Sequence, residues 1–136
     1  MSAPAVAVSP DGSKFATAWK DVRTGENKVY WSVSESPDIT SDAPIRKTLF
    51  GEQNHPSIAI DTSGTVWVAW EDSQPTGQQI WIRSSADSDK GTAISDRSEG
   101  ASFPVVATNA GMVAVVYEAE KDGESTVMFR RIPPTK

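Results

Sequence analysis

One strand–turn–strand unit occurs three times in this sequence of 136 residues, at intervals of about 50 residues. Each copy opens with a proline and a short apolar run, turns at a glycine, and continues with a second apolar run that ends in an aromatic residue. The residues at these positions are Pro4, Pro56 and Pro104; Gly12, Gly64 and Gly111; and Trp19, Trp70 and Tyr117. Glycine supplies the positive φ that a tight hairpin turn needs, and β-branched and aromatic residues favour strands. The repeat therefore predicts three antiparallel meanders.

Each copy continues through a polar loop with a central glycine into a third strand. These strands are predicted at residues 29–34, 80–85 and 127–131. A weaker fourth strand is predicted only twice, at residues 45–50 and 92–95. No helix is predicted, because no window combines the 3.6-residue apolar period with capping residues.

Repeats of this length built from antiparallel meanders are typical of β-propeller blades. We predict an all-β fold in which residues 1–136 form a single half-propeller domain, with four-stranded blades at about 4–51, 52–99 and 100–136. An immunoglobulin-like sandwich also uses short strands and glycine turns. A sandwich, however, gives no reason for the same unit to begin three times.

Three blades do not close a ring, since propellers have about four to eight. The outer faces of the two terminal blades would each expose several hundred Å² of apolar surface, roughly the size of the largest patches that soluble monomers expose. We therefore expect a homodimer, in which two copies placed head to tail form a six-bladed ring. The alternative is that the chain is part of a longer propeller.

Composition restricts the partners. With 13 basic and 18 acidic residues and a net charge of −5, the chain has no basic surplus for a nucleic acid or an anionic membrane. No apolar run approaches the roughly 20 residues of a membrane span. The absence of cysteine excludes disulfides and thiolate zinc sites. Residues 1–4 show no signal-peptide pattern, so the compartment stays open: intracellular, or secreted or periplasmic after removal of a leader.

The blade plan resembles that of the sialidase-like propellers that carry bacterial neuraminidase repeats, also called Asp-box repeats. In that family a Ser-x-Asp-x-Gly-x-x-aromatic turn joins the third and fourth strands of a blade. The most similar stretch here is Ser85-Ala86-Asp87-Ser88-Asp89-Lys90-Gly91-Thr92-Ala93-Ile94, with two extra residues before the glycine and Ile94 in place of an aromatic residue. The resemblance implies that Asp87 and Gly91 stabilise a turn and have no catalytic role.

Sialidase chemistry, as the resemblance implies, needs three arginines for a substrate carboxylate, a tyrosine nucleophile beside a glutamate, and an aspartate acid/base. Only fragments of this set occur. The sequence Phe-Arg-Arg-Ile-Pro at 129–133 is similar to a Phe-Arg-Ile-Pro motif of the family, but it has an extra arginine and lies at the opposite end of the chain. Tyr117 and Glu118 are neighbours, yet Tyr117 has the repeat position of Trp19 and Trp70, which favours a core role. No catalytic residue is predicted.

In a propeller, the loops between second and third strands and the links between blades share one face, around the mouth of the channel. We predict that this face carries a ligand-binding rim formed by Asp21, Arg23, Glu52, His55, Glu71, Asp72, Arg97, Glu99 and Glu118. His55 is the only histidine, so no histidine cluster for zinc exists within one chain. It is expected to turn the chain before Pro56. No cofactor is predicted; calcium is the alternative, since it takes oxygen ligands, but no EF-hand spacing is present.

These observations predict a non-catalytic ligand-binding or scaffolding propeller that recognises a glycan or a peptide at the channel mouth. The alternative is a sialidase-type glycoside hydrolase assembled from two chains. An active sialidase must bring three arginines together, so sialoside cleavage by the wild type and by Arg23 or Arg97 variants distinguishes the two hypotheses.

Overall fold

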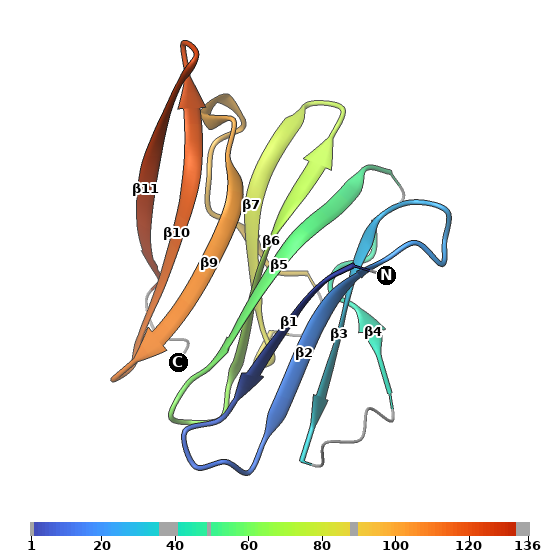
Figure 1. The fold of residues 1–136 in the computed structure, drawn as a ribbon, viewed down its shortest axis with the longest axis vertical. Coiled ribbons are helices and arrows are strands. Elements are labelled where there is room, and N and C mark those ends of the chain that lie inside the picture. Colours follow the sequence, from blue (N-terminus) through green and yellow to red (C-terminus); the bar gives the residue numbers. More distant parts are fainter. Residues whose placement is uncertain (1, 36–40, 49, 88–89, 133–136) are drawn as a thin grey trace.

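Three antiparallel sheets follow one another along the chain (Figure 1), in a computed structural model that describes residues 2–35, 41–48, 50–87 and 90–132. The first sheet consists of β1 (Ser2–Val8), β2 (Phe15–Asp21), β3 (Lys28–Ser34) and β4 (Ala43–Pro44). The second consists of β5 (Glu52–Ile60), β6 (Val66–Gln74), β7 (Gly77–Ser84) and β8 (Thr92–Ala93). The third consists of β9 (Ser102–Asn109), β10 (Met112–Lys121) and β11 (Glu124–Ile132). Strands that are consecutive within a sheet are paired, so the predicted all-β meander is confirmed.

The first strands of the three sheets lie beside one another. β5 packs against β1 on one side and β9 on the other, and Figure 1 shows β9, β5 and β1 running across the molecule in a similar direction. The later strands of each sheet lie farther from this central row. Adjacent inner strands with outer strands turned away form the arrangement of consecutive propeller blades. In the part of the chain that the structure describes, the three sheets form an open array.

Two hydrophobic clusters fill the spaces between the sheets. The cluster between the first and second sheets contains Ala18, Val29, Val68 and Trp70, and Trp70 is 0% exposed. The cluster between the second and third sheets contains Trp67, Ala69, Ile80, Ile82, Val113, Val115 and Tyr117. Because β6 lies between two sheets, every residue from 66 to 72 is buried. Burial of each large apolar side chain contributes about 1.5–3 kcal/mol.

The hairpin turns form where the glycines predicted them. Gly12, Gly64 and Gly111 have φ angles of 76°, 83° and 78°, in the left-handed region that favours glycine. Two of these turns are also closed by aspartate: Asp61 Oδ1 accepts hydrogen bonds from Ser63 N and Thr65 N, both 3.0 Å long. Asp11 accepts a similar bond from Ser13 N.

Three sequence predictions need correction. The third blade was predicted with four strands, but among the described residues its sheet has three, β9, β10 and β11. The fourth strand of the first sheet is Ala43–Pro44, and the strand predicted at 45–50 is wrong for residues 45–48 and 50, whereas residue 49 lies outside the described residues. Ile45 is instead 0% exposed in a linker that leads to β5, and its side chain fills the first core cluster. A short 3-10 helix, η1 (Arg97–Glu99), was not predicted, although Asp96 and Glu99 form a capping box. None of the helical structure in the described ranges is long and apolar enough to cross a membrane.

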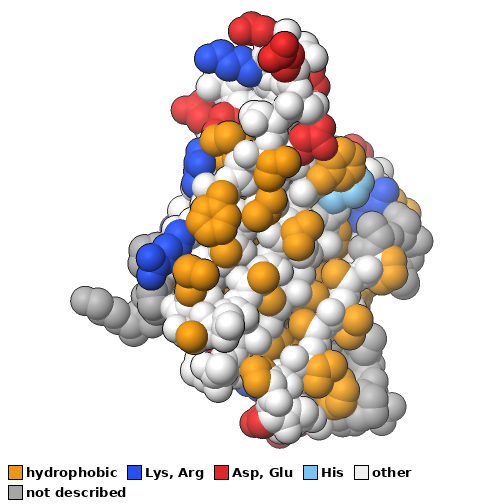
Figure 2. All heavy atoms as spheres, turned by 60° about the vertical axis from the view of Figure 1, so that its left-hand side comes forward, with side chains coloured by type: hydrophobic (Ala, Val, Ile, Leu, Met, Phe, Trp, Pro, Cys, Tyr) orange, Lys and Arg blue, Asp and Glu red, His pale blue; other side chains and the backbone are white. Residues whose placement is uncertain are grey.

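The two ends of the array have exposed apolar faces. On the third sheet, the face turned away from the second sheet carries Val105, Val116, Val127 and Phe129, with Val127 73% exposed. Figure 2 shows apolar side chains spread over the middle of this side of the molecule and charged ones at its upper end. On the first sheet, the face turned away from the second sheet exposes Val6 (72%) and Val8 of β1. No sheet of the described residues covers either face.

Candidate functional site

Two bulky residues in the inner strands have left-handed backbone conformations. His55 in β5 has φ 51° and Phe103 in β9 has φ 54°. Each directly precedes a repeat proline, Pro56 or Pro104, and the pairing register of both strands shifts close to these residues. Such a conformation costs about 1–3 kcal/mol for a residue with a large side chain, and strained residues of this kind cluster at functional sites. The bulges at His55 and Phe103 therefore mark the first candidate site.

A buried carboxylate joins the two strained residues. Glu71 comes from β6, where it pairs with Asn54 across the sheet. Its Oε2 lies 2.8 Å from His55 Nδ1 and accepts a 2.7 Å hydrogen bond from Phe103 N. The Glu71 side chain is only 6% exposed. One carboxylate thus holds two neighbouring blades together at the strained positions.

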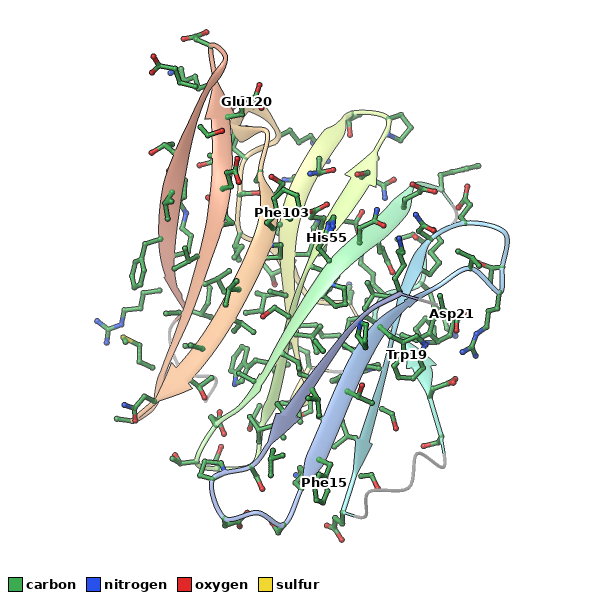
Figure 3. All side chains as sticks on the ribbon, in the orientation of Figure 1. Phe15, Trp19, Asp21, His55, Phe103 and Glu120 are labelled. Atoms are coloured by element: carbon green, nitrogen blue, oxygen red, sulfur yellow. The ribbon has the colours of Figure 1, made fainter. Side chains whose placement is uncertain are left out.

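The side chains of His55 and Phe103 meet at the surface. Their ring centroids are 4.7 Å apart at an interplanar angle of 58°, and Figure 3 shows the two labelled residues next to each other between β9 and β5. The His55 side chain is 47% exposed and Phe103 is 55% exposed. A large aromatic ring that is half exposed beside a fixed polar group is typical of a recognition surface.

This arrangement limits the chemistry of the site. A carboxylate only accepts hydrogen bonds, so His55 Nδ1 carries the hydrogen in the contact with Glu71, and a neutral imidazole offers Nε2 as an acceptor. The Phe103 ring adds an apolar surface beside it. Together they can bind a ligand that combines hydroxyl groups with an apolar face. Among the residues that the structure describes, no group of three or more His, Cys, Asp or Glu side chains is placed to hold a metal ion.

Asp21 and Arg23, both predicted for the rim, form a separate surface cluster at the end of β2 (Figure 3 labels Asp21 and Trp19). Arg23 Nη2 lies 2.6 Å from Asp21 Oδ2 and 3.2 Å from Asp42 Oδ2, and its guanidinium lies 4.0 Å from the centre of the Tyr30 ring. The hydrogen bond from Arg23 holds the pKa of Asp21 well below its usual range. Trp19 Nε1 also donates to Asp21 Oδ2, at 3.2 Å. These charged groups are thus bound to each other.

Asp72 has the same repeat position as Asp21 but lies inside the protein. Its side chain is 0% exposed and accepts hydrogen bonds from Trp70 Nε1 (3.2 Å), Arg46 Nη1 (3.3 Å) and Gln74 Nε2 (2.7 Å). The Arg46 guanidinium lies 3.8 Å from the centre of the Trp81 ring. The structure therefore places Asp72 between the first and second blades and away from any exposed rim.

The remaining predicted rim residues are Glu52, Arg97, Glu99 and Glu118, of which Arg97 and Glu99 lie together in η1. Glu52 and Arg97 are exposed. Glu99 accepts hydrogen bonds from Tyr117 Oη (3.0 Å) and Arg130 Nη2 (2.9 Å). Burial, and then the bond to Glu99, raise the pKa of Tyr117 to about 12. Glu118 is exposed on the opposite face of β10 from Tyr117 and accepts from Ser125, so these two neighbours form no Tyr–Glu pair.

The Asp-box interpretation has no support from the structure or from comparison with known proteins. Asp87 is exposed, and the turn that precedes it is closed by the backbone bond from Asp87 N to Ser84 O. Gly91 does have a structural requirement: its φ is 72°, and a Cβ there would lie 2.5 Å from Ile82 O. Residues 88 and 89 of this stretch are outside the described residues.

Comparison with known proteins identifies a fold and no family. No family model matches the sequence, and no curated protein matches it. Among solved structures, the chain is similar to the endo-arabinase from Bacteroides thetaiotaomicron VPI-5482, with a TM-score of 0.59 and 11% sequence identity. The similarity covers 98% of this chain and 56% of that chain, so the chain spans little more than half the length of its structural neighbour. This neighbour has a propeller-type fold, which agrees with the arrangement of the three sheets.

Proposed function

We propose that this chain is a non-catalytic, saccharide-binding domain of propeller type, with His55, Phe103 and Glu71 at its contact site. The observation that supports this proposal is the pair of half-exposed rings on adjacent inner strands, held in left-handed conformations by one buried carboxylate. Sugars combine hydroxyl groups with an apolar C–H face. The Phe103 ring would pack against that face, while His55 Nε2 would accept a hydrogen bond from a hydroxyl group.

The structural likeness to an endo-arabinase supports a carbohydrate ligand over a peptide. Hydrolysis is less well supported, because most glycoside hydrolases use two carboxyl groups on either side of the scissile bond. Glu71 is instead bound to His55 and to the backbone of Phe103. The predicted sialidase alternative needs three converging arginines, whereas Arg23 is held by Asp21 and Asp42.

Calorimetric titration with arabino-oligosaccharides, followed by other neutral oligosaccharides, tests the proposal. We expect Phe103→Ala to weaken binding at least about tenfold, because the apolar surface of the ring is lost. Phe50→Ala is the matched control, since Phe50 is 69% exposed and lies outside the site. Absence of saccharide binding by the wild type, or equal effects of the two variants, would refute the proposal. Release of reducing ends in the same samples, or cleavage of a sialoside, would favour a hydrolase.

We also propose that a second copy of the chain covers both end faces and completes a six-bladed ring. The residues of each end face correspond, by their position in the repeat, to residues of a face that is buried between two sheets elsewhere in the array. On the first sheet, Val6, Val8 and Phe15 have the positions of Ile58, Ile60 and Val66. Trp19 and Tyr30 have the positions of Trp70 and Trp81, but they are already buried within the single chain, at 6% and 8% exposed. On the third sheet, Val105, Val116, Val127 and Phe129 have the positions of Ser57, Ala69, Ile80 and Ile82. A head-to-tail contact between copies would therefore repeat the internal packing of sheets.

Light scattering tests this assembly. We expect the wild type to have the mass of a dimer, and Val127→Glu/Phe129→Lys to have the mass of a monomer, because charges would enter an apolar contact. Val22→Glu is the control, since Val22 is 52% exposed in a loop outside both faces. A monomeric wild type would refute the dimer and favour additional blades of a longer chain. A dimer that the double variant leaves intact would show that these faces do not form the contact.

A further inference from the structure

A groove between the outer parts of the first and second blades collects positive charge. Its larger cavity, of about 490 Å³, is lined by Ala43, Pro44, Arg46, Lys47, Arg83 and Lys90. A smaller cavity of about 250 Å³ shares Pro44, Arg46 and Lys47 with it and adds Thr24, Glu26, Lys28, Tyr30 and Thr48. Five of the 13 basic residues of the chain thus line adjoining cavities, against one acidic residue of the described lining. The protein as a whole has a net charge of −5, so this cluster of positive charge is confined to the groove.

The two arginines of the groove are fixed in place by aromatic rings. The Arg46 guanidinium lies 3.8 Å from the centre of the Trp81 ring, and that of Arg83 lies 4.8 Å from the centre of the Trp31 ring. Arg83 Nη1 also donates a 2.6 Å hydrogen bond to Ile45 O. A guanidinium that is already ordered loses less conformational freedom when it binds an anion. Arg46 is partly neutralised by Asp72 at 3.3 Å.

Two lysines add positive charge to the arginines of the groove. Lys47 and Lys90 are both exposed at the groove, whereas Lys28 lies 3.3 Å from Glu26. Arg83, Lys47 and Lys90 all line the larger cavity, so an anion there would lie beside three basic side chains. Guanidinium groups bind carboxylate and sulfate through paired N–H donors, and lysines act as additional point charges.

We propose that this groove binds the carboxylate or sulfate groups of an acidic saccharide. Because it takes the chain to be a saccharide-binding domain, this inference rests on the proposed function, but it assigns a second site away from His55 and Phe103. A nucleic acid fits less well: its phosphates extend far beyond one groove, and the remaining surface of this acidic protein would repel them.

Calorimetric titration with oligogalacturonates and with a sulfated oligosaccharide of similar length tests the groove. We expect the wild type to bind at least one of them, with an affinity that falls as salt increases. The one bound more tightly identifies the acidic group. Lys47→Glu/Lys90→Glu should weaken this binding about tenfold or more, because two attractive contacts become repulsive. The single variants Lys47→Gln and Lys90→Gln should each weaken it by a smaller factor.

Lys121→Gln is the matched control for each single change, because Lys121 is exposed at the end of β10, outside the groove. Phe103→Ala separates the two sites: it should weaken neutral saccharide binding and leave acidic saccharide binding unchanged. A wild type that binds acidic saccharides but no neutral ones would thus contradict only the proposed contact site at His55 and Phe103. The groove proposal is overturned if the wild type binds no acidic saccharide, if the lysine variants bind as the wild type does, or if single-stranded DNA of equal charge binds more tightly.

Discussion

Removal of the Glu71 carboxylate should destabilise the protein far more than removal of its repeat counterpart. Glu71 follows Trp70 and Glu118 follows Tyr117, so both have the same position in their blades. The Glu71 side chain is 6% exposed and binds His55 Nδ1 and Phe103 N. Glu118 is exposed and binds only the Ser125 hydroxyl among the described contacts. The comparison of Glu71→Ala with Glu118→Ala therefore isolates the effect of a buried carboxylate that bridges β5 and β9.

The magnitude follows from the bonds that are lost. Without Glu71, the part-buried Phe103 N–H lacks its carboxylate acceptor, which costs about 1–3 kcal/mol. The half-exposed contact between His55 Nδ1 and the carboxylate contributes about 1 kcal/mol. We expect Glu71→Ala to lower the free energy of unfolding by about 3 kcal/mol, and Glu118→Ala by about 0.5 kcal/mol.

Urea denaturation followed by far-ultraviolet circular dichroism measures this difference. For a domain of this size, ΔG falls by about 2 kcal/mol per M urea, so the two midpoints should differ by about 1 M. Exchange of the Phe103 amide hydrogen should also accelerate in Glu71→Ala, because that amide donates to the carboxylate. Equal midpoints for the two variants, or an unchanged exchange rate at Phe103, would show that Glu71 does not bridge the blades as the structure indicates.

Two further predictions concern single positions. Gly91→Ala should lower the free energy of unfolding, measured by thermal denaturation, by about 3 kcal/mol or more, since the new Cβ would lie 2.5 Å from Ile82 O. Gly25→Ala should lower it by only about 1 kcal/mol, because nothing lies within 4 Å of the added Cβ. Similar values for the two variants would argue against the close contact at Gly91. Tyr117 should ionise near pH 12 in an ultraviolet titration, above the ordinary value of 10.0. Its protonated form then contributes stability that is complete below pH 10 and is lost as the pH rises through 12; ionisation at the ordinary value would contradict the buried contact with Glu99.

The sheets could be predicted because the repeat fixes them locally. Alternating glycine turns and β-branched runs specify each hairpin without reference to the rest of the chain. Which faces of the sheets are covered, in contrast, is not specified locally. β6 and β10 are both apolar on two faces, but only β6 lies between two sheets, so β10 alternates between buried and exposed residues. Strand composition therefore indicates that a face must be covered and does not indicate by what.

The candidate site was only partly predictable. His55 was expected to turn the chain, but it lies at a bulge inside β5 with its ring held by Glu71. Phe103 precedes Pro104 as His55 precedes Pro56, so comparison of the repeats could have identified it. The left-handed φ angles follow from contacts between strands that are far apart in the sequence. Asp21 and Asp72 share a repeat position and differ in burial because only Asp72 has a blade in front of it.

The matching of the two end faces has a consequence for how the number of blades is determined. In a linear stack, an added sheet covers one face and presents an equivalent one, so growth gives no reduction in exposed apolar surface. Only the return of the last sheet to the first removes both ends at once. The angle between successive sheets depends on the side chains packed between them, such as Trp67 and Trp70 on the two faces of β6. This angle would thus decide the number of blades in a closed ring. A substitution that widens the angle would favour a different number of blades.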